Sequence, residues 1–395
     1  MDEEFWKVIE NFNIGENREM EVDSSIFPMF SSLKSLKLSK ATVPLTALLW
    51  INSDTNRIHH LDINSIKILE SAEFNFPFEA LGDEDISPKT WTFCGKNLEW
   101  LDISGIGTID TVRLNSFCRI KWLYANRNKI RRVLVDGNEL QTLYLDHNAL
   151  VELPLVEKSK KHVFKNLQYL SLVNNSIEES PETILELFPG LQSLNLASNK
   201  LPEFLISSKE DEDNSKLKII NLSNNKLSRF DLFATLQALN VLDLSHNNLA
   251  HFSFQALIMA PSLQNLHLSN NLNILIETLN IVRNFSLKEL DLRACSLMNK
   301  MPDLSMFSEL QMVDLSQNSL SGELDGHFLP KKIQNVSFRK NYITKVGNFS
   351  RLQLEEIQLL DVGMNPLDCK CGVQTELLKI VKKQEDFHAS ILYHL

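Results

Sequence analysis

A nine-residue pattern of leucines and polar residues recurs through most of this chain. In its clearest copies leucine stands at the first, fourth and sixth positions and asparagine at the ninth, as in LQSLNLASN from Leu191 and LNVLDLSHN from Leu239. The alternation in the middle predicts a short strand whose leucines face a core and whose intervening residues face outward. The asparagine predicts a turn away from the strand, because a buried amide can satisfy backbone groups of adjacent turns.

The copies recur at a nearly constant interval of about 25 residues on average, within the 20–29 residues of the leucine-rich repeat. The chain therefore resembles leucine-rich repeat proteins. That resemblance implies an α/β repeat solenoid, a horseshoe with a parallel concave β-ribbon and an irregular or short-helical convex side. The copies start at Leu33, Ile58, Leu98, Ile120, Leu140, Leu167, Leu191, Leu217, Leu239, Leu263, Leu287, Leu310, Ile333 and Ile357.

The spacing also predicts the organisation of the chain. Residues 1–32 are expected to form an N-terminal cap or a degenerate repeat, with a weak partial copy around Met20 and Val22. Residues 33–364 hold about fourteen repeats, and residues 365–395 follow as a C-terminal cap. Because 40 residues separate Ile58 from Leu98, residues 67–97 contain either a decayed repeat or an inserted loop.

Composition narrows the class of protein further. The net charge of −10 argues against nucleic-acid binding, which needs a concentrated basic face. No apolar run reaches about 18 residues, so any membrane attachment is expected through segments outside this chain. The acidic start lacks the basic end and apolar stretch of a secretory signal. The chain is therefore either cytosolic or a piece of a longer protein.

The segment NPLDCKC, which contains Cys369 and Cys371, follows the last repeat directly. It resembles the start of the cysteine-rich C-terminal cap of extracellular leucine-rich repeat proteins, such as Toll-like receptors, Slit-like proteins and neuronal adhesion receptors. That resemblance implies two further cysteines as disulfide partners, but no cysteine follows before Leu395. We therefore expect a fragment that ends inside its cap. A zinc site is disfavoured, because two more ligands at suitable spacing are lacking.

The other cysteines have different expected roles. Cys94 and Cys118 lie just before the strands of neighbouring repeats. Stacking could bring them within disulfide reach, although two independent buried thiols fit equally well. Cys295 takes the place of the asparagine in its repeat, and we interpret it as a buried structural residue.

N-glycosylation motifs occur about as often as chance predicts for this composition, so their number does not indicate secretion. Candidate sites are Asn174, Asn284 and Asn348. Asn221 and Asn335 also carry the motif, but they face outward from predicted strands, where a glycan would obstruct the concave surface.

Catalysis finds little support in the sequence. His147 and His246 precede the asparagine of two different repeats, and repetition explains them better than a nucleophile–base pair. Motifs for nucleophilic, metalloprotease or phosphate-binding chemistry are missing, and neither cofactor nor metal is expected. A column of aspartates lies between the inward leucines of several strands, and we interpret it as a solvated face. It consists of Asp102, Asp243, Asp291, Asp314 and Asp361.

Aromatic residues gather at outward positions of four consecutive predicted strands. Tyr124 and Tyr144 occupy the same slot in adjacent strands, so they should lie about 5 Å apart. Exposed aromatics rimmed by polar residues are typical of interface hot spots, although packing against an N-terminal cap or a loop is the alternative. The predicted ligand-binding set is Trp100, Trp122, Tyr124, Tyr144 and Tyr169, with Arg127, Asp146 and His147 as its rim.

Together these features predict a non-catalytic recognition module. The first hypothesis is a cell-surface receptor or adhesion ectodomain that binds a protein or other macromolecule on its concave face. For a Toll-like receptor the resemblance implies a separate signalling domain, and a homodimer formed on ligand binding is a further expectation. The alternative is a cytoplasmic scaffold or targeting subunit, for example of a phosphatase or ubiquitin ligase. An enzyme with a substrate-docking repeat region ranks third.

Overall fold

The computed structural model divides the chain into two units, Met1–Asn199 and Lys200–Leu395, which we describe separately. The structure describes residues 6–17, 23–44, 57–68, 90–93, 97–114, 119–135, 139–154, 164–180, 182–207, 216–277, 285–298, 303–347, 349, 352 and 356–368.

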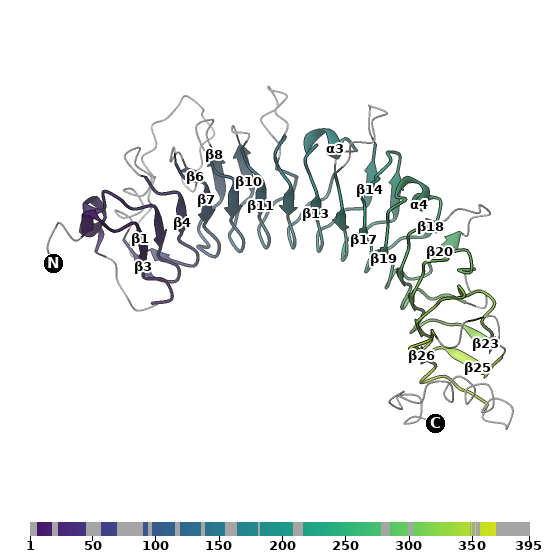
Figure 1. Cartoon of the computed structure of the whole chain (residues 1–395). Coiled ribbons are helices and arrows are strands. Elements are labelled where there is room, and N and C mark those ends of the chain that lie inside the picture. The colour runs from purple at the N-terminus through teal and green to yellow at the C-terminus, as the bar shows by residue number, and fades with distance from the viewer. Residues whose placement is uncertain are drawn as a thin grey trace. The chain divides into compact units, whose positions relative to one another are not determined.

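The first unit is built on a ribbon of parallel three-residue strands (Figure 1). Neighbouring strands pair in register so that the central leucines align from Leu36 through Leu61 and Leu101 to Leu194. These leucines are at most 1% exposed because they face the core, as the alternating pattern predicts. The strands, in order, are β1 (Asn11–Asn13), β2 (Ser35–Lys37), β4 (His60–Asp62), β7 (Trp100–Asp102), β9 (Trp122–Tyr124), β11 (Thr142–Tyr144), β12 (Tyr169–Ser171) and β13 (Ser193–Asn195).

The second unit repeats this arrangement. Its central residues, from Ile220 to Leu360, are again buried and paired in register. The strands are β15 (Ile219–Asn221), β17 (Val241–Asp243), β19 (Asn265–His267), β21 (Glu289–Asp291), β22 (Met312–Asp314), β24 (Asn335–Ser337) and β26 (Leu359–Asp361).

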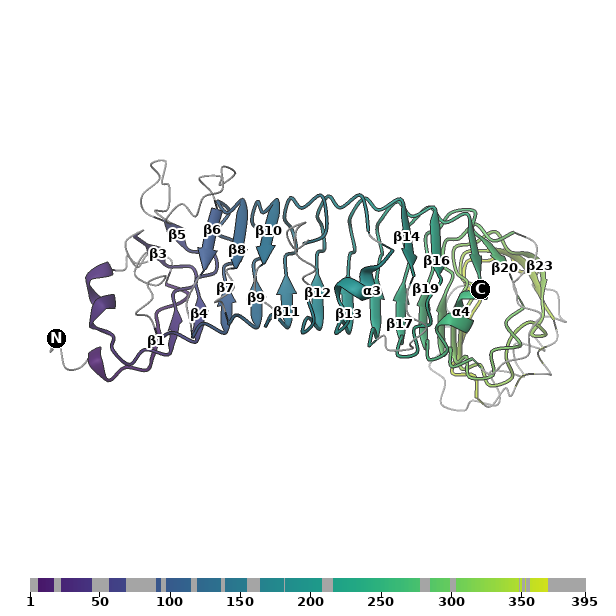
Figure 2. The ribbon, with the colours of Figure 1, turned by 90° about the horizontal axis from the view of Figure 1, so that it is seen from above.

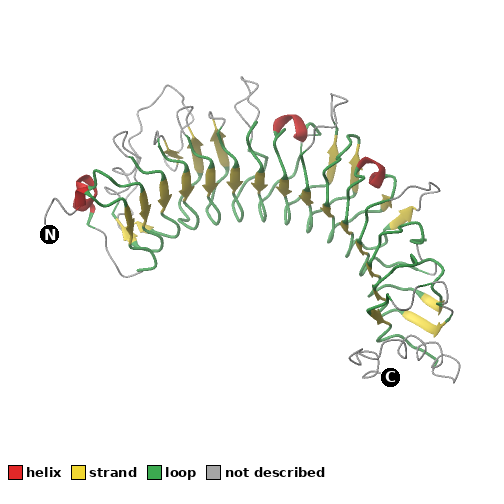
Figure 3. Ribbon diagram, in the orientation of Figure 1, coloured by secondary structure: helices red, strands yellow, loops and turns green. Residues whose placement is uncertain are grey.

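Short parallel sheets and helical turns lie on the other side of many turns of the solenoid. Figure 2 separates one such row, β6, β8 and β10, from the ribbon strands β7, β9 and β11. The side strands are β3 (Thr42–Val43), β5 (Lys67–Ile68), β6 (Thr90–Phe93), β8 (Thr111–Leu114), β10 (Arg132–Val135), β14 (Glu203–Ile206), β16 (Arg229–Leu232), β18 (His251–Ser253), β20 (Leu275–Glu277), β23 (Ser321–Leu324) and β25 (Tyr342–Val346). Among the described residues, the helices, red in Figure 3, include the 3-10 helix η1 (Ser24–Met29), α3 (Ile184–Leu187) and α4 (Ala256–Met259).

The predicted solenoid is confirmed, and a ribbon strand begins two residues after each predicted repeat start. β4 pairs directly with β7, although their repeats are separated by the long spacing noted in the sequence. The described strand within residues 1–32 is β1, whereas the weak copy expected around Met20 and Val22 lies outside the described residues. In the described part of the chain, no helix combines the length and hydropathy needed to cross a membrane.

In the repeats that carry it, from Asn128 onward, the asparagine joins successive turns. Asn175, for example, donates its amide to the carbonyls of Leu145 and Leu172, both at 3.0 Å, and accepts the N–H of Leu150 at 3.1 Å. The residue before this asparagine adopts a left-handed backbone, with φ near 55° at Arg127, His147 and their counterparts. These contacts satisfy backbone groups that the tight turn would otherwise bury without partners.

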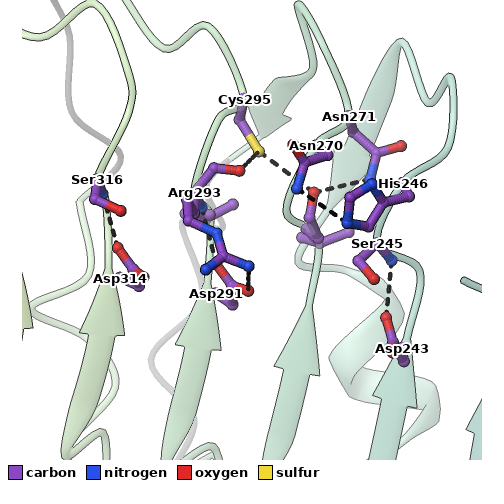
Figure 4. A network of polar contacts seen from close by, with 12 residues as sticks. Asp243, Ser245, His246, Asn270, Asn271, Asp291, Arg293, Cys295, Asp314 and Ser316 are labelled. Carbon is purple, nitrogen blue, oxygen red and sulfur yellow. Dashed lines mark hydrogen bonds and ion pairs between the residues drawn. The ribbon is translucent and has the colours of Figure 1, made fainter. Parts of the chain in front are cut away.

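In the turn that follows β21, Cys295 occupies the position that asparagine holds in other repeats, as predicted (Figure 4). Its side chain is fully buried, and its Sγ lies 3.3 Å from the carbonyl oxygen of Leu268. Burial raises the pKa of the thiol to about 12. Cys295 is therefore a structural substitute for asparagine.

Candidate functional site: an aromatic face on the ribbon

Outward residues of the first unit form two columns along the ribbon, because in-register pairing places equivalent positions side by side. The first column contains Ser35, His60, Trp100, Trp122, Thr142, Tyr169 and Ser193. The second contains Lys37, Asp62, Asp102, Tyr124, Tyr144, Ser171 and Asn195. We call His60, Trp100, Trp122, Tyr124, Tyr144 and Tyr169 the aromatic face.

Four rings of the aromatic face contact one another across strands. His60 stacks on Trp100 with ring centroids 3.8 Å apart and planes 7° from parallel. Trp100 lies 5.4 Å from Tyr124. Tyr124 meets Tyr144 edge to face at 5.2 Å, which confirms the predicted neighbourhood of these two tyrosines. A series of ring contacts therefore crosses β4, β7, β9 and β11.

The aromatic rings are less exposed than the sequence suggests. Tyr169 is 41% exposed, whereas Trp100, Trp122, Tyr124 and Tyr144 are half-buried. These four side chains face outward as predicted but are less exposed than expected, because the hydrophobic pattern shows which way a side chain points but not how neighbouring rings cover one another. Burial raises the pKa of Tyr144, and neighbouring Tyr124 and Asp146 act in the same direction.

Sequence reasoning missed His60 as a member of this face. The segment HHLDI places His60 in the slot that Trp100 holds in EWLDI, so alignment of the repeats would have found it. Burial lowers the pKa of His60, the positive charge of Lys37 acts in the same direction, and Asp62 and Asp102 oppose it. His60 is consequently an uncharged aromatic ring at neutral pH.

Two carboxylates border the aromatic face, and we call Asp62 and Asp102 the acidic edge. They pair across β4 and β7, and Asn64 donates its amide to both, at 2.6 Å and 3.4 Å. Lys37 lies 3.4 Å from the Asp62 carboxylate. Burial raises the pKa of Asp102, and the charge of Asp62 raises it further, against hydrogen bonds from Ser104 and Asn64.

The three predicted rim residues lie in the turns that follow β9 and β11. Arg127 and His147 are exposed, and His147 Nδ1 lies 2.7 Å from the Asn174 amide. The carboxylate of Asp146 instead accepts hydrogen bonds from the Ser171 hydroxyl at 2.6 Å and the Val173 N–H at 2.8 Å. Asp146 thus connects successive turns of the solenoid, which the sequence did not indicate.

The aspartate column has a structural explanation, which Figure 4 shows for the second unit. The carboxylates of Asp243 and Asp314 accept the N–H of the residue two positions later, at 2.9 Å and 2.8 Å. Asn195 and Asn221 do the same through their side-chain oxygens. Such side-chain caps stabilise the bend after the strands that end in Asp or Asn. Within the described ranges, His, Cys, Asp and Glu form no group of three that could hold a metal ion.

The repeat structure also explains His147 and His246, the two histidines considered above as part of a nucleophile–base pair. His147 and His246 both adopt left-handed backbones, with φ of 57° and 54°. Each contacts the asparagine at the equivalent place of the next turn, Asn174 at 2.7 Å and Asn270 at 3.3 Å. These matching contacts favour a role in the turns.

Several predicted sites lie outside the described residues: Cys94, Cys118, Cys369, Cys371, Asn284 and Asn348. Asn174 is described and exposed, one residue before the asparagine that joins its turn to the preceding one.

No protein-family model matches the chain. Comparison with individual proteins, however, finds relatives that share part of its repeat region. Human leucine-rich repeats and immunoglobulin-like domains protein 2 is 30% identical over 132 residues, covering 33% of this chain and 11% of that protein. Human podocan-like protein 1 is 32% identical over 240 residues, covering 52% of this chain and 44% of that protein. The matches therefore span less than half the length of these relatives.

A solved leucine-rich repeat protein of Leptospira interrogans has the same fold. Its TM-score is 0.62 at 19% sequence identity, with 96% of both chains covered. The observed solenoid and the comparisons agree that this chain is a leucine-rich repeat protein.

Proposed function

We propose that this chain is the recognition module of a secreted or cell-surface protein, which binds a protein ligand on the aromatic face without chemistry of its own. The observation that carries the proposal is the series of ring contacts from His60 through Trp100 and Tyr124 to Tyr144. The resemblance of NPLDCKC to the C-terminal cap of extracellular leucine-rich repeat proteins supports the location.

Physical reasoning favours this surface over the rest of the ribbon. Tryptophan and tyrosine are enriched in binding hot spots because they bury a large area with few rotatable bonds. Trp100 and Tyr124 are held by neighbouring rings on regular strands, so little side-chain freedom remains to be lost on binding. A protein ligand could cover Tyr169 and the half-buried rings together.

A peptide-display selection on the immobilised full chain tests the proposed surface. We expect the enriched peptides to lose binding to a Trp122→Ala/Tyr144→Ala double variant and to keep it for Val151→Ala. Val151 is a matched control, because it is 59% exposed and lies in the same repeat as Tyr144 but off the ribbon. Equal binding of the peptides to the double variant would remove the proposal.

The proposed location has a separate test. In the natively produced full-length protein, we expect Cys369 and Cys371 to resist thiol labelling until a reductant is added, because oxidising compartments favour disulfides. Free thiols at both positions would favour the intracellular scaffold instead.

A further inference from the structure

The acidic edge carries more negative charge than its described neighbours neutralise. Asp62 is paired with Lys37 at 3.4 Å. Asp102 receives hydrogen bonds from the Ser104 N–H at 2.9 Å and the Asn64 amide at 3.4 Å, but it forms no ion pair with any residue that the structure describes. His60 adds no cation at neutral pH, because burial lowers its pKa. Among the described residues, one negative charge is therefore left unneutralised at the border of the aromatic face.

Two aromatic rings lie beside that charge. Trp100 and Asp102 both lie on β7 and project to the same side of it. Tyr124, on the neighbouring strand β9, is the in-register partner of Asp102. The ring centroids of Trp100 and Tyr124 are 5.4 Å apart. Carboxylates and aromatic rings both attract cations, and a planar guanidinium can engage the two together.

The neighbouring strand shows the same preference within this chain. The ammonium of Lys121 lies 5.9 Å from the ring centroid of Trp122 and 3.1 Å from the Glu99 carboxylate. A carboxylate and an aromatic ring thus share one cation there. No cation of the described segments occupies the corresponding place over Trp100 or Tyr124.

We propose that the protein partner presents an arginine side chain, which pairs with Asp102 and lies against the rings of Trp100 and Tyr124. The inference rests on the proposed function and names the chemistry that the aromatic face recognises. Charge complementarity supports it, since the chain carries a net charge of −10 and would attract a basic partner. Arginine fits better than lysine because its guanidinium can both stack and bind a carboxylate through two N–H groups.

The test uses a blocked seven-residue peptide with one central arginine among glycines and serines, and a twin in which citrulline replaces the arginine. Citrulline keeps the shape of arginine and removes its charge. Binding to the full chain is followed by NMR of the tryptophan indole N–H groups. The variants are Asp102→Asn and Asp314→Asn. Asp314 holds the equivalent strand position in the second unit, where its in-register neighbours are Asp291 and Ser337 rather than aromatic residues.

We expect the arginine peptide to bind at least about tenfold more tightly than its citrulline twin. Asp102→Asn should remove most of that difference and Asp314→Asn should leave it unchanged. The Asp102→Asn variant should fold, since asparagine makes the same cap at Asn195 and Asn221. Equal affinity of the two peptides, no measurable binding, or full binding by Asp102→Asn would each overturn the inference.

Failure of the arginine preference can be distinguished from failure of the proposed function. If displayed peptides still depend on Trp122 and Tyr144 while arginine and citrulline bind equally, the aromatic face remains a binding surface and only the arginine preference fails. If displayed peptides ignore the face, the proposed function fails with it.

Discussion

Tyr124 and Tyr144 meet edge to face on adjacent strands, with ring centroids 5.2 Å apart and planes at 80°. This geometry brings the positive edge of one ring to the negative face of the other. A double-mutant cycle of Tyr124→Ala and Tyr144→Ala should give a coupling energy of about 1 kcal/mol in urea unfolding. Additive effects of the two substitutions, within error, would show that the contact does not stabilise the ribbon.

The asparagine contacts between turns should contribute more to stability than the cysteine that replaces one of them. Asn271 is fully buried, donates to the carbonyls of Leu244 and Leu268, and accepts the Leu249 N–H. Asn271→Ala leaves these groups unpaired and should lower the free energy of unfolding by at least about 2 kcal/mol.

Cys295→Ala provides the matched control, because a thiol is only a weak hydrogen-bond donor and little is lost with it. Urea unfolding of both variants measures the difference. A larger loss for Cys295→Ala than for Asn271→Ala would contradict the structural role of the asparagines.

The lowered pKa of His60 predicts a pH dependence of stability. Because the folded state favours the neutral ring, this contribution is fully present above the ordinary pKa of 6.5 and is lost as pH falls through the lower folded-state pKa. His60→Phe retains an aromatic ring beside Trp100 and cannot be protonated. We expect the variant to gain stability relative to wild type as the pH decreases from 7.5 to about 5, measured by urea unfolding. A constant difference across this range would contradict the burial of His60.

Cys295 should react slowly with alkylating reagents in the folded protein. With its pKa raised to about 12, only about one thiol in ten thousand is ionised at pH 8, and the side chain is fully buried. Iodoacetamide treatment followed by peptide mass spectrometry should find Cys295 unmodified before denaturation and modified after it. Rapid native modification would show that this turn opens readily.

The positions of the ribbon strands follow from sequence because each strand is specified locally, by leucines such as Leu143 and by the asparagine five residues later. The closeness of Tyr124 and Tyr144 also follows, since repeats of constant register align equivalent slots. His60 could have been found by aligning HHLDI with EWLDI, whereas the shared environment of Asp62 and Asp102 depends on the pairing of residues far apart in the chain. The same is true of Asp146, whose carboxylate bonds to the next turn.

The central claim is that the aromatic face is the binding surface, and affinity for a peptide selected on the full chain tests it most directly. Isothermal titration with Trp122→Ala, Tyr144→Ala and the control Val151→Ala gives three dissociation constants to compare with wild type. We predict that each aromatic substitution weakens binding by about 30-fold or more, equivalent to about 2 kcal/mol, and that Val151→Ala has no effect. Wild-type affinity in both aromatic variants would contradict the account.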